Sequence, residues 1–434
     1  MIWHESLLMT KVTFFDRVTL LCVLLMLLFY TGSLFLSFDV FGSGYLQGSG
    51  LYPLLLACGC FGLILPRSAY LRRASATTFL VLLWVGWMFS TSLIWGTGDT
   101  VRFWAESNIG PVLLWPSIYL FFYVLCRKCP TVCPFVILFF CLLAGLCAIV
   151  FCEVYLRQDK RAAVLVEVYY PLLILPWIML LKRPVWRYLG MATVAFLVFL
   201  SLKRTALLVL ASSSLVWLVV HTLLTYRKKG EGIGALVLVV LAVVLSALAF
   251  YRLDESQGGE YVARLQSSIE DRGSGRVDIY EEVVDLISES SLEWMIFGHG
   301  HNAVIRHLSQ ETSAHNDWLE VQFDFGVGGT VLYSLLHLSL IVKSRRLIRE
   351  RSPYAAAFAM SYVMFCLMSA TSHLIIYPSY IIFLVAFWGM VEGLTRGEQS
   401  HPLVPLPGLG IFQQLRGSRQ NGLLQDGVRI DQTP

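Results

Sequence analysis

The chain is poor in charged residues and rich in long apolar runs. Of its 434 residues, 56% are hydrophobic and only 14% are Asp, Glu, Lys or Arg. Soluble domains average about 45–50% apolar and about 25% charged residues. This shortage of charge excludes an ordinary soluble protein and predicts a membrane protein.

Three other features are missing. None of the ten cysteines lies in the one long polar segment, so disulfides are not expected to hold that segment together. The CxxC at Cys126–Cys129 stands alone and is better explained by chance in a Cys-rich membrane protein than by a metal or redox site. The first apolar run, Val18–Leu36, has no small-residue cleavage site, so we expect a first membrane span rather than a cleaved signal peptide.

What the sequence does contain is a series of runs with about 17–25 mostly apolar residues, the length of a membrane-spanning helix. The runs predict an all-α polytopic membrane protein with about twelve transmembrane helices. They are Val18–Leu36, Leu51–Pro66, Thr77–Trp95, Ile109–Cys126, Thr131–Cys152, Val164–Leu181, Val185–Leu202, Thr205–Tyr226, Ile233–Tyr251, Gly326–Val342, Ala355–Ala370 and Leu374–Val391.

The positions of Lys and Arg support this alternation. With a cytoplasmic amino terminus, 22 of the 33 Lys and Arg residues fall on the cytoplasmic side, as the positive-inside rule requires. We therefore expect both termini in the cytoplasm. The predicted organisation is transmembrane helices over 1–251, a long external loop over 252–325, three more helices over 326–392 and a disordered cytoplasmic tail over 393–434.

The external loop is predicted to be partly helical. Apolar residues with the i, i+3, i+4, i+7 spacing of an amphipathic helix are Tyr280, Val283, Val284 and Ile287, in a helix that starts near Arg276. Gly298-His299-Gly300 predicts a turn. A second helix is expected to begin near Asn316 and to continue into the span at Gly326.

Two cations interrupt an apolar stretch on the side of the membrane where the rule predicts few. Lys203 and Arg204 lie between two predicted spans. An ionisable group near the hydrocarbon is costly and is a functional candidate. The alternative is that both side chains only extend to the lipid headgroups.

The long loop contains five Arg and no Lys among fifteen acidic residues. Arg276 is expected on the first turn of a helix, where a guanidinium and the helix amino terminus together suit a phosphate. The fork of Arg is preferred over Lys for such recognition. Arg264, Arg272 and Arg306 are better explained as ion-pair partners of the many acids, whereas for Arg276 phosphate binding is favoured.

Histidines follow in the same loop. His315 has an ordinary pKa near neutrality and is a candidate general base, with a capping or packing role as the alternative. His299 and His301 could join it at a metal, but no ligand spacing such as HExxH supports that. Glu167 is an isolated carboxylate on the external side that could pair with a cation of the site, and a structural role explains it equally well.

These pieces together resemble the O-antigen ligase and O-antigen polymerase superfamily. The resemblance covers about residues 185–345 and rests on four motifs. They are Ser-x-x-Arg-Thr-Ala at Ser201–Ala206, Ser-Gly-Arg at Ser274–Arg276, the Gly-x-Gly turn at Gly298–Gly300, and His315-Asn316 followed after nine residues by Gly326 and after two more by Gly329.

The resemblance implies transfer of a glycan from undecaprenyl diphosphate to an acceptor hydroxyl at the periplasmic face of the bacterial inner membrane. It implies His315 as catalytic base, with Asn316, Glu167 and His301 in supporting roles. The lipid diphosphate would bind Arg204 and Arg276 in the first rank, with Lys203 and Arg264 in the second. We expect inversion at the anomeric carbon and no metal or other cofactor.

The acceptor distinguishes two activities within the superfamily. A polymerase uses a second lipid-linked repeat unit of O-antigen, capsule or exopolysaccharide, and a ligase uses lipid A-core. The stretches Asn316–Glu320 and Phe323–Gly326 favour a polymerase. Expected partners are the lipid-linked glycan, the acceptor glycan, membrane lipids and a chain-length regulator, with no nucleic acid.

A transporter such as a flippase for the same lipid is the rival interpretation. Twelve spans and external cations would suit it. However, the charges do not follow a path through the bilayer, and no paired Gly- or Pro-broken spans of an inverted repeat are found. The large loop on one side favours an enzyme.

Overall fold

The computed structural model describes residues 14–37, 75–94, 109–157, 165–225, 276–310, 312–375 and 377–397, together with isolated positions at 57, 59, 60, 62, 64, 251, 252 and 255. Within these ranges the regular structure consists of helices, with no strand. The all-α expectation is confirmed for this part of the chain.

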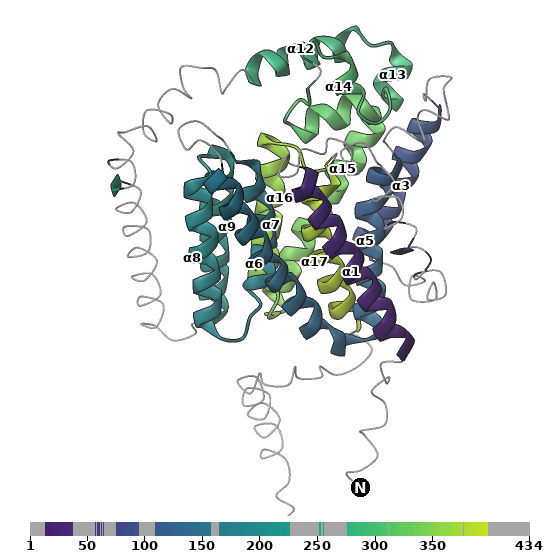
Figure 1. Ribbon diagram of the computed structural model, residues 1–434. Coiled ribbons are helices and arrows are strands. Elements are labelled where there is room, and N and C mark those ends of the chain that lie inside the picture. The colour runs from purple at the N-terminus through teal and green to yellow at the C-terminus, as the bar shows by residue number, and fades with distance from the viewer. Residues whose placement is uncertain are drawn as a thin grey trace, which may run out of the picture.

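Ten helices stand side by side as a bundle with broadly similar axis directions (Figure 1). In lipid there is no water to bond the backbone N–H and C=O groups, so these groups must pair within the protein. A helix pairs them within its own segment. The helices of the bundle are α1 (Phe14–Ser37), α3 (Ala76–Ile94), α5 (Ile109–Lys128), α6 (Cys133–Arg157), α7 (Tyr169–Ile178), α8 (Pro184–Leu200), α9 (Arg204–Thr225), α15 (Asp317–Arg349), α16 (Ala355–Thr371) and α17 (Pro378–Gly397).

Each of these helices coincides with a predicted span. Those over Pro130–Arg157, Arg204–Thr225 and Asp317–Arg349 are long and apolar enough to cross a membrane. Most of Leu51–Pro66 and nearly all of Ile233–Tyr251 lie outside the described residues, as do 398–434 of the predicted tail. The total of twelve spans stays a prediction.

The centre of the bundle is the contact between α5 and α17. A Cβ added to Gly389 would lie 2.3 Å from the carbonyl oxygen of Tyr119, and one added to Gly393 would lie 2.4 Å from that of Tyr123. These two glycines are four residues apart and face α5 together. Small residues with this spacing let membrane helices approach closely.

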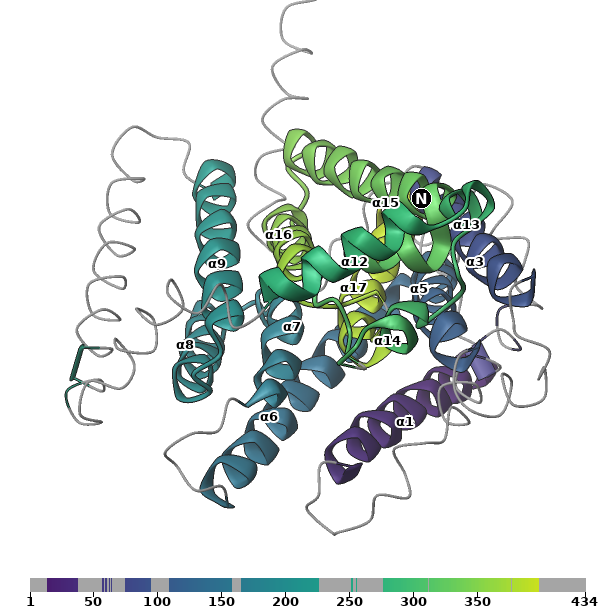
Figure 2. The same cartoon turned by 90° about the horizontal axis from the view of Figure 1, so that it is seen from above.

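A cap of three short helices covers one end of the bundle. It comprises residues 276–316 and contains α12 (Arg276–Glu289), α13 (Leu292–Phe297) and α14 (Ala303–His307). Seen from above, α12 crosses over the ends of the bundle helices (Figure 2). The predicted helix that includes Arg276 and the turn at Gly298–Gly300 are both found among the described residues.

One predicted detail of α12 is wrong. Val284 was expected on its apolar face, but its side chain is 50% exposed, whereas Ile279 and Val283 are buried. Those two residues pack with Val304 and Phe323 of the cap core. The face is set by the position of α14 and α15, which the spacing within α12 alone does not contain.

The helix α15 joins the cap to the bundle, and a kink at Gly326 divides it. The second helix predicted near Asn316, running into the span at Gly326, is confirmed. The first part packs beneath α12, α13 and α14, and the second part descends through the bundle (Figure 1).

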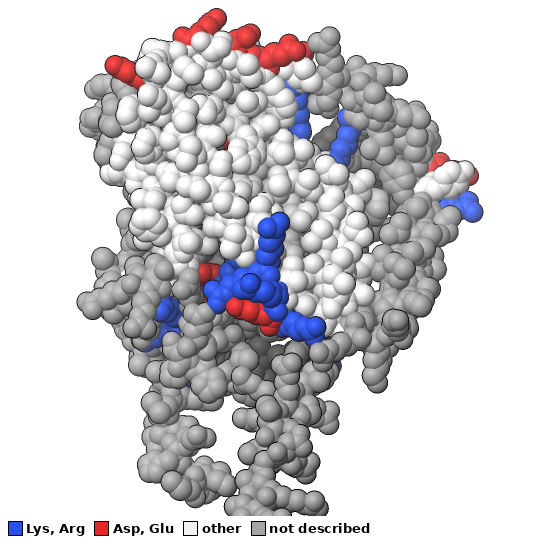
Figure 3. All heavy atoms as spheres, turned by 180° about the vertical axis from the view of Figure 1, so that it is seen from behind, with Lys and Arg blue, Asp and Glu red and all other residues white. Residues whose placement is uncertain are grey.

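Charge is separated along the molecule (Figure 3). Acidic side chains lie on the cap, where the exposed ones include Asp278, Glu281, Asp285, Glu289 and Glu293. Toward the opposite end, exposed cations follow the last turn of α15, namely Arg345, Arg349 and Arg351. Between them lies a largely uncharged surface, with a few cations close to the cap, to which α15 contributes Leu335, Leu338 and Val342 (Figure 3). An apolar belt of this kind suits contact with lipid.

Candidate active site

His315 occupies the last turn of the cap, where the chain enters α15. Its φ angle is +52°, a left-handed conformation that side chains other than glycine adopt rarely. The hydroxyl of Tyr280 on α12 donates to the His315 carbonyl at 3.4 Å. Strained backbone held in this way is concentrated at functional sites.

Asn316 is the N-cap of α15. Its side-chain oxygen accepts hydrogen bonds from the backbone N–H of Trp318 at 2.9 Å and of Leu319 at 3.4 Å. Asn is among the best residues for this position. Its amide also donates to the carbonyl of Ala370 on α16 at 3.4 Å. The supporting role predicted for Asn316 thus has a structural basis, because it fixes the chain beside His315.

A second histidine, His373, lies against His315. Their Nδ1 atoms are 3.1 Å apart, and the ring centroids are 4.9 Å apart. The hydroxyl of Ser313 is 3.0 Å from the same Nδ1 of His373. The ring of His373 also packs on Tyr377, with centroids 4.0 Å apart.

Sequence reasoning missed His373. It belongs to the short polar break Thr371-Ser372-His373, between two predicted spans and on the same predicted side as the long loop. A histidine in such a break was the available signal. What the sequence lacks is the information that residues 58 positions apart meet.

Arg276 begins α12 and reaches the same place. Its Nη1 donates to the carbonyl of Thr371, at the end of α16, at 2.5 Å. This bond ties the first turn of the cap to the loop that carries His373. The guanidinium also acts electrostatically on both histidines.

Burial and nearby cations keep the two histidines neutral. Burial, followed by the charges of Arg276 and Lys203, lowers the pKa of His315 to about 4. Burial, followed by His315, Lys203 and Arg276, lowers the pKa of His373 to about 3. At neutral pH both rings are therefore uncharged, and a neutral imidazole has a lone pair that can take a proton.

Lys203 approaches the histidine pair from the turn between α8 and α9. Its Nζ lies 5.9 Å from the centre of the Tyr169 ring. Its charge also interacts with Glu167, a residue 4% exposed in the short helix η4 (Val166–Val168). Arg204 follows as the first residue of α9 and is half-buried.

The motif Ser-x-x-Arg-Thr-Ala forms this turn. The hydroxyl of Ser201 donates to the carbonyl of Val198 at 2.7 Å and accepts from the backbone N–H of Lys203 at 3.2 Å. The backbone N–H of Leu165 donates to the Ser201 carbonyl at 3.2 Å. Ser201 thereby fixes the segment that carries Lys203.

The glycines of the two motifs meet where the cap crosses α15. Gly326 has φ +65° and ψ −167°, and Gly298 has φ +78° and ψ 176°. This region is essentially restricted to glycine. A Cβ on Gly326 would lie 2.3 Å from the Ile296 carbonyl, and one on Gly298 would lie 2.3 Å from the Asp324 carbonyl. The spacing after His315 therefore lets two backbones touch.

Asp324 secures the turn that follows Gly298. Its carboxylate accepts from the backbone N–H of Asn302 at 2.7 Å and of Val304 at 3.0 Å. It is fully buried. Its place in the predicted polymerase-like stretch is thus explained by the folding of the cap.

The other predicted residues lie elsewhere or are not described. His301 is 1% exposed and stacks on Phe325, with centroids 6.1 Å apart, so a supporting role would act through packing. Arg264 lies outside the described residues. In the described part of the chain, no group of three or more His, Cys, Asp or Glu is placed to hold a metal ion.

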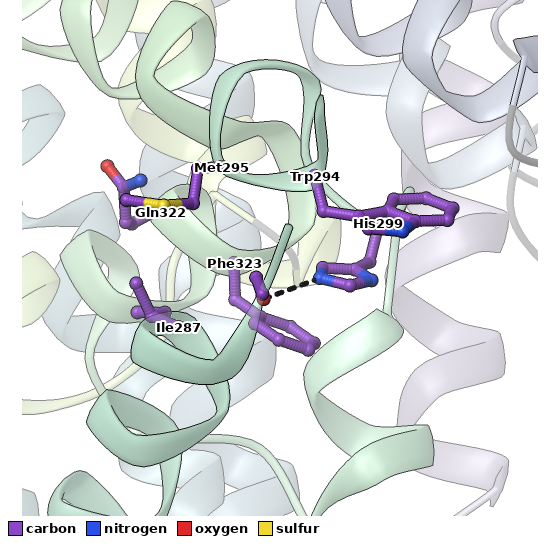
Figure 4. Close-up of a pocket in the computed structure, with 7 residues that line it drawn as sticks. Ile287, Trp294, Met295, His299, Gln322 and Phe323 are labelled. Atoms are coloured by element: carbon purple, nitrogen blue, oxygen red, sulfur yellow. Dashed lines mark hydrogen bonds between the residues drawn. The ribbon is translucent and has the colours of Figure 1, made fainter. Parts of the chain in front are cut away.

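A shallow depression in the cap is separate from this site (Figure 4). His299 lies there between Trp294 and Phe323, with ring centroids 4.5 and 4.3 Å away. Its Nε2 is 3.0 Å from the Ser290 hydroxyl. The lining includes His299, a candidate metal ligand from the sequence, but not His315 or the cations predicted to bind the diphosphate.

The family model described as O-Antigen ligase matches residues 189–334, the segment that contains the four motifs. A search of curated proteins finds no match. The matched segment starts in α8, includes the whole cap and ends in the membrane-crossing part of α15. With its long apolar helices and this match, the chain has the features of a membrane protein and is similar over residues 189–334 to the O-antigen ligase family.

Proposed function

We propose that the protein is a glycosyltransferase that takes a glycan from undecaprenyl diphosphate and polymerises lipid-linked repeat units at the periplasmic face of the inner membrane. One observation carries the proposal. A candidate base and two cations, from segments far apart in the sequence, gather at one place beside the end of the bundle. They are His315, Arg276 and Lys203.

The proposed step is a direct displacement at the anomeric carbon. The oxygen of the acceptor hydroxyl forms a bond to that carbon while the bond from the carbon to the diphosphate breaks. The electron pair of the broken bond leaves with the diphosphate, and the hydroxyl proton passes to Nε2 of His315. The proton then leaves to water, and the configuration of the carbon is inverted.

Arg276 and Lys203 are proposed to bind the diphosphate, with Arg204 and Arg264 as further candidates. Fixed cations stabilise negative charge that develops on a leaving group, most strongly in a site with little water. Because these side chains can supply that charge, we expect transfer to continue when divalent metals are chelated with EDTA.

Substrate binding is expected to strengthen the base. Burial is the main reason for the low pKa of His315, and the charges of Arg276 and Lys203 lower it further. A bound diphosphate carries negative charge beside those cations and therefore offsets their effect. The pKa of His315 then rises toward its ordinary value, which makes proton transfer from the acceptor more favourable.

Surface polysaccharide from a deletion strain tests the proposal. Complementation with the wild-type protein should restore the ladder, and His315→Ala or Arg276→Ala should fail to restore it while the protein stays in the membrane. The exposed His307→Asn is the matched control and should restore the ladder. Wild-type ladders from His315→Ala and Arg276→Ala would overturn the proposal.

The material that accumulates identifies the acceptor. Lipid A-core carrying a single repeat unit is the result expected for a polymerase. Bare core together with long lipid-linked polymer would instead identify a ligase. Glycan transfer by the purified protein in detergent, without a second compartment, would exclude a pure transporter.

A further inference from the structure

His373 stands at the same place as the proposed base, and nothing in the motifs assigns it a role. It lies in the loop between α16 and α17, 3.1 Å from His315 through the two Nδ1 atoms. A hydrogen bond between two nitrogens needs one proton, because one nitrogen must donate and the other accept. The partner that holds this proton decides the chemistry of the other ring nitrogen.

Two arrangements are possible for the neutral pair. If His315 carries the proton on Nδ1, its Nε2 has a free lone pair and can act as a base. If His373 carries the proton, Nδ1 of His315 accepts it, and the proton of His315 sits on Nε2. In that second form Nε2 cannot take a proton from an acceptor.

The position of His373 is fixed from several sides. The carboxylate of Asp317, two residues after His315, accepts from the backbone N–H of Leu374 at 2.8 Å and of Ile375 at 3.3 Å. Asp317 also accepts from the hydroxyl of Tyr333 at 3.0 Å and is fully buried. The start of α15 therefore holds the His373 loop against the turn that carries His315.

The loop is held on its other side by the cap. Arg276 donates to the carbonyl of Thr371, and the hydroxyl of Ser313 contacts Nδ1 of His373 at 3.0 Å. Tyr377 covers one side of the ring. A ring held by this many contacts can fix the orientation and the proton position of its neighbour.

We propose that His373 is a positioning residue. Its Nδ1 accepts a hydrogen bond from the Nδ1–H of His315, which leaves the lone pair on Nε2 of His315 free to face the acceptor hydroxyl. This rests on the proposed function, in which His315 is the base. The general requirement is familiar from catalytic triads, where a third group orients the histidine. Here the third group is a neutral imidazole rather than a carboxylate.

A direct test reads the proton positions without any turnover. The full-length protein, labelled with ¹⁵N-histidine in lipid nanodiscs, is compared with His315→Gln to assign the signals of His315. We expect Nδ1 of His315 to be protonated and Nε2 to be unprotonated at neutral pH. An unprotonated Nδ1 with a protonated Nε2 would overturn the proposal, whatever the enzyme catalyses.

Two variants then separate a positioning role from packing. His373→Leu keeps bulk but removes the acceptor, and should lower kcat about 100-fold with little change in KM for the lipid-linked donor. His373→Asn offers a carbonyl oxygen near the place of Nδ1 and should recover at least tenfold of that loss. The control is His307→Asn on the exposed face of α14.

The outcomes separate this inference from the proposed function. Activity lost in His315→Ala but retained in His373→Leu would leave the function standing and refute the positioning role. Equal losses in His373→Leu and His373→Asn would also refute it, because packing alone would then explain both. Activity retained in His315→Ala would refute the proposed function first.

Discussion

Two groups of histidines lie in or beside the cap, and their surroundings differ. His299 and His301 are neighbours in a Gly-His-Gly-His motif, yet one is stacked between aromatic rings and the other is buried on Phe325. His315 and His373 are 58 residues apart and are joined by a hydrogen bond beside Arg276. The second pair differs because the two histidines bond to each other and two cations, Arg276 and Lys203, act on both rings. The closeness of two histidines in a sequence motif does not mark them as site residues.

The largest effect expected from this comparison is the loss of the base. His315→Ala should lower kcat for glycan transfer about 10³-fold, because general bases contribute about 10²–10⁴-fold. His307→Asn, an exposed histidine of the cap, should keep kcat within about twofold of wild type. Purified proteins in detergent, with equal amounts of folded protein, give the comparison. Similar losses in both variants would mean that His315 is not special.

Substitution of Gly326, at the kink of α15 below the cap, should destabilise the cap without directly changing the chemical step. Gly326→Ala places a Cβ 2.3 Å from the Ile296 carbonyl in a conformation restricted to glycine. We expect the free energy of unfolding to fall by at least about 1–3 kcal/mol. Limited proteolysis of the membrane-embedded protein should then cut the cap sooner than in wild type. Unchanged proteolysis of Gly326→Ala would contradict this description of the junction.

Substitutions of the neighbouring cations Lys203 and Arg204 should lower kcat/KM by different amounts. Lys203 acts on both site histidines, so Lys203→Gln should lower kcat/KM about tenfold or more. Arg204→Gln should have a smaller effect. Steady-state kinetics with a defined lipid-linked donor would measure both. A larger loss for Arg204→Gln would return Arg204 to the first rank that the sequence motif gives it.

The smallest expected effect is a shift between the pH profile of kcat/KM and the pH profile of kcat. The base must be unprotonated, and the pKa of His315 in the free protein is lowered to about 4 by burial, Arg276 and Lys203. Values of kcat/KM should therefore fall only as the pH drops through about 4. Because bound diphosphate offsets the cations, kcat should fall about one pH unit higher. Coincident profiles would show that the diphosphate does not bind beside His315.

The positions of the bundle helices could be predicted from the sequence, because an apolar run of sufficient length marks a membrane-spanning helix. The helix that contains Arg276, the turn at Gly298 and the helix that begins near Asn316 follow from local chemistry. The apolar face of α12 could not be predicted fully, since Val284 is exposed by the way α14 and α15 pack.

The candidate site was predicted in part for the same reason. Lys203 and His315 stand out as polar residues close to predicted spans, and Arg276 stands out as a cation at a predicted helix start. The meeting of His315 with His373 depends on Asp317 holding the loop after α16, a contact across 57 residues. No periodicity or short motif contains such a contact.

Glycan transfer by the purified protein tests the role of His315 most directly. Wild-type protein in detergent, given undecaprenyl-diphosphate-linked repeat units and EDTA, should form products with two or more repeats, identified by mass spectrometry. His315→Ala, equally folded, should form none above the uncatalysed background. Equal product from both proteins would contradict the assignment of His315 as the base and with it the central claim.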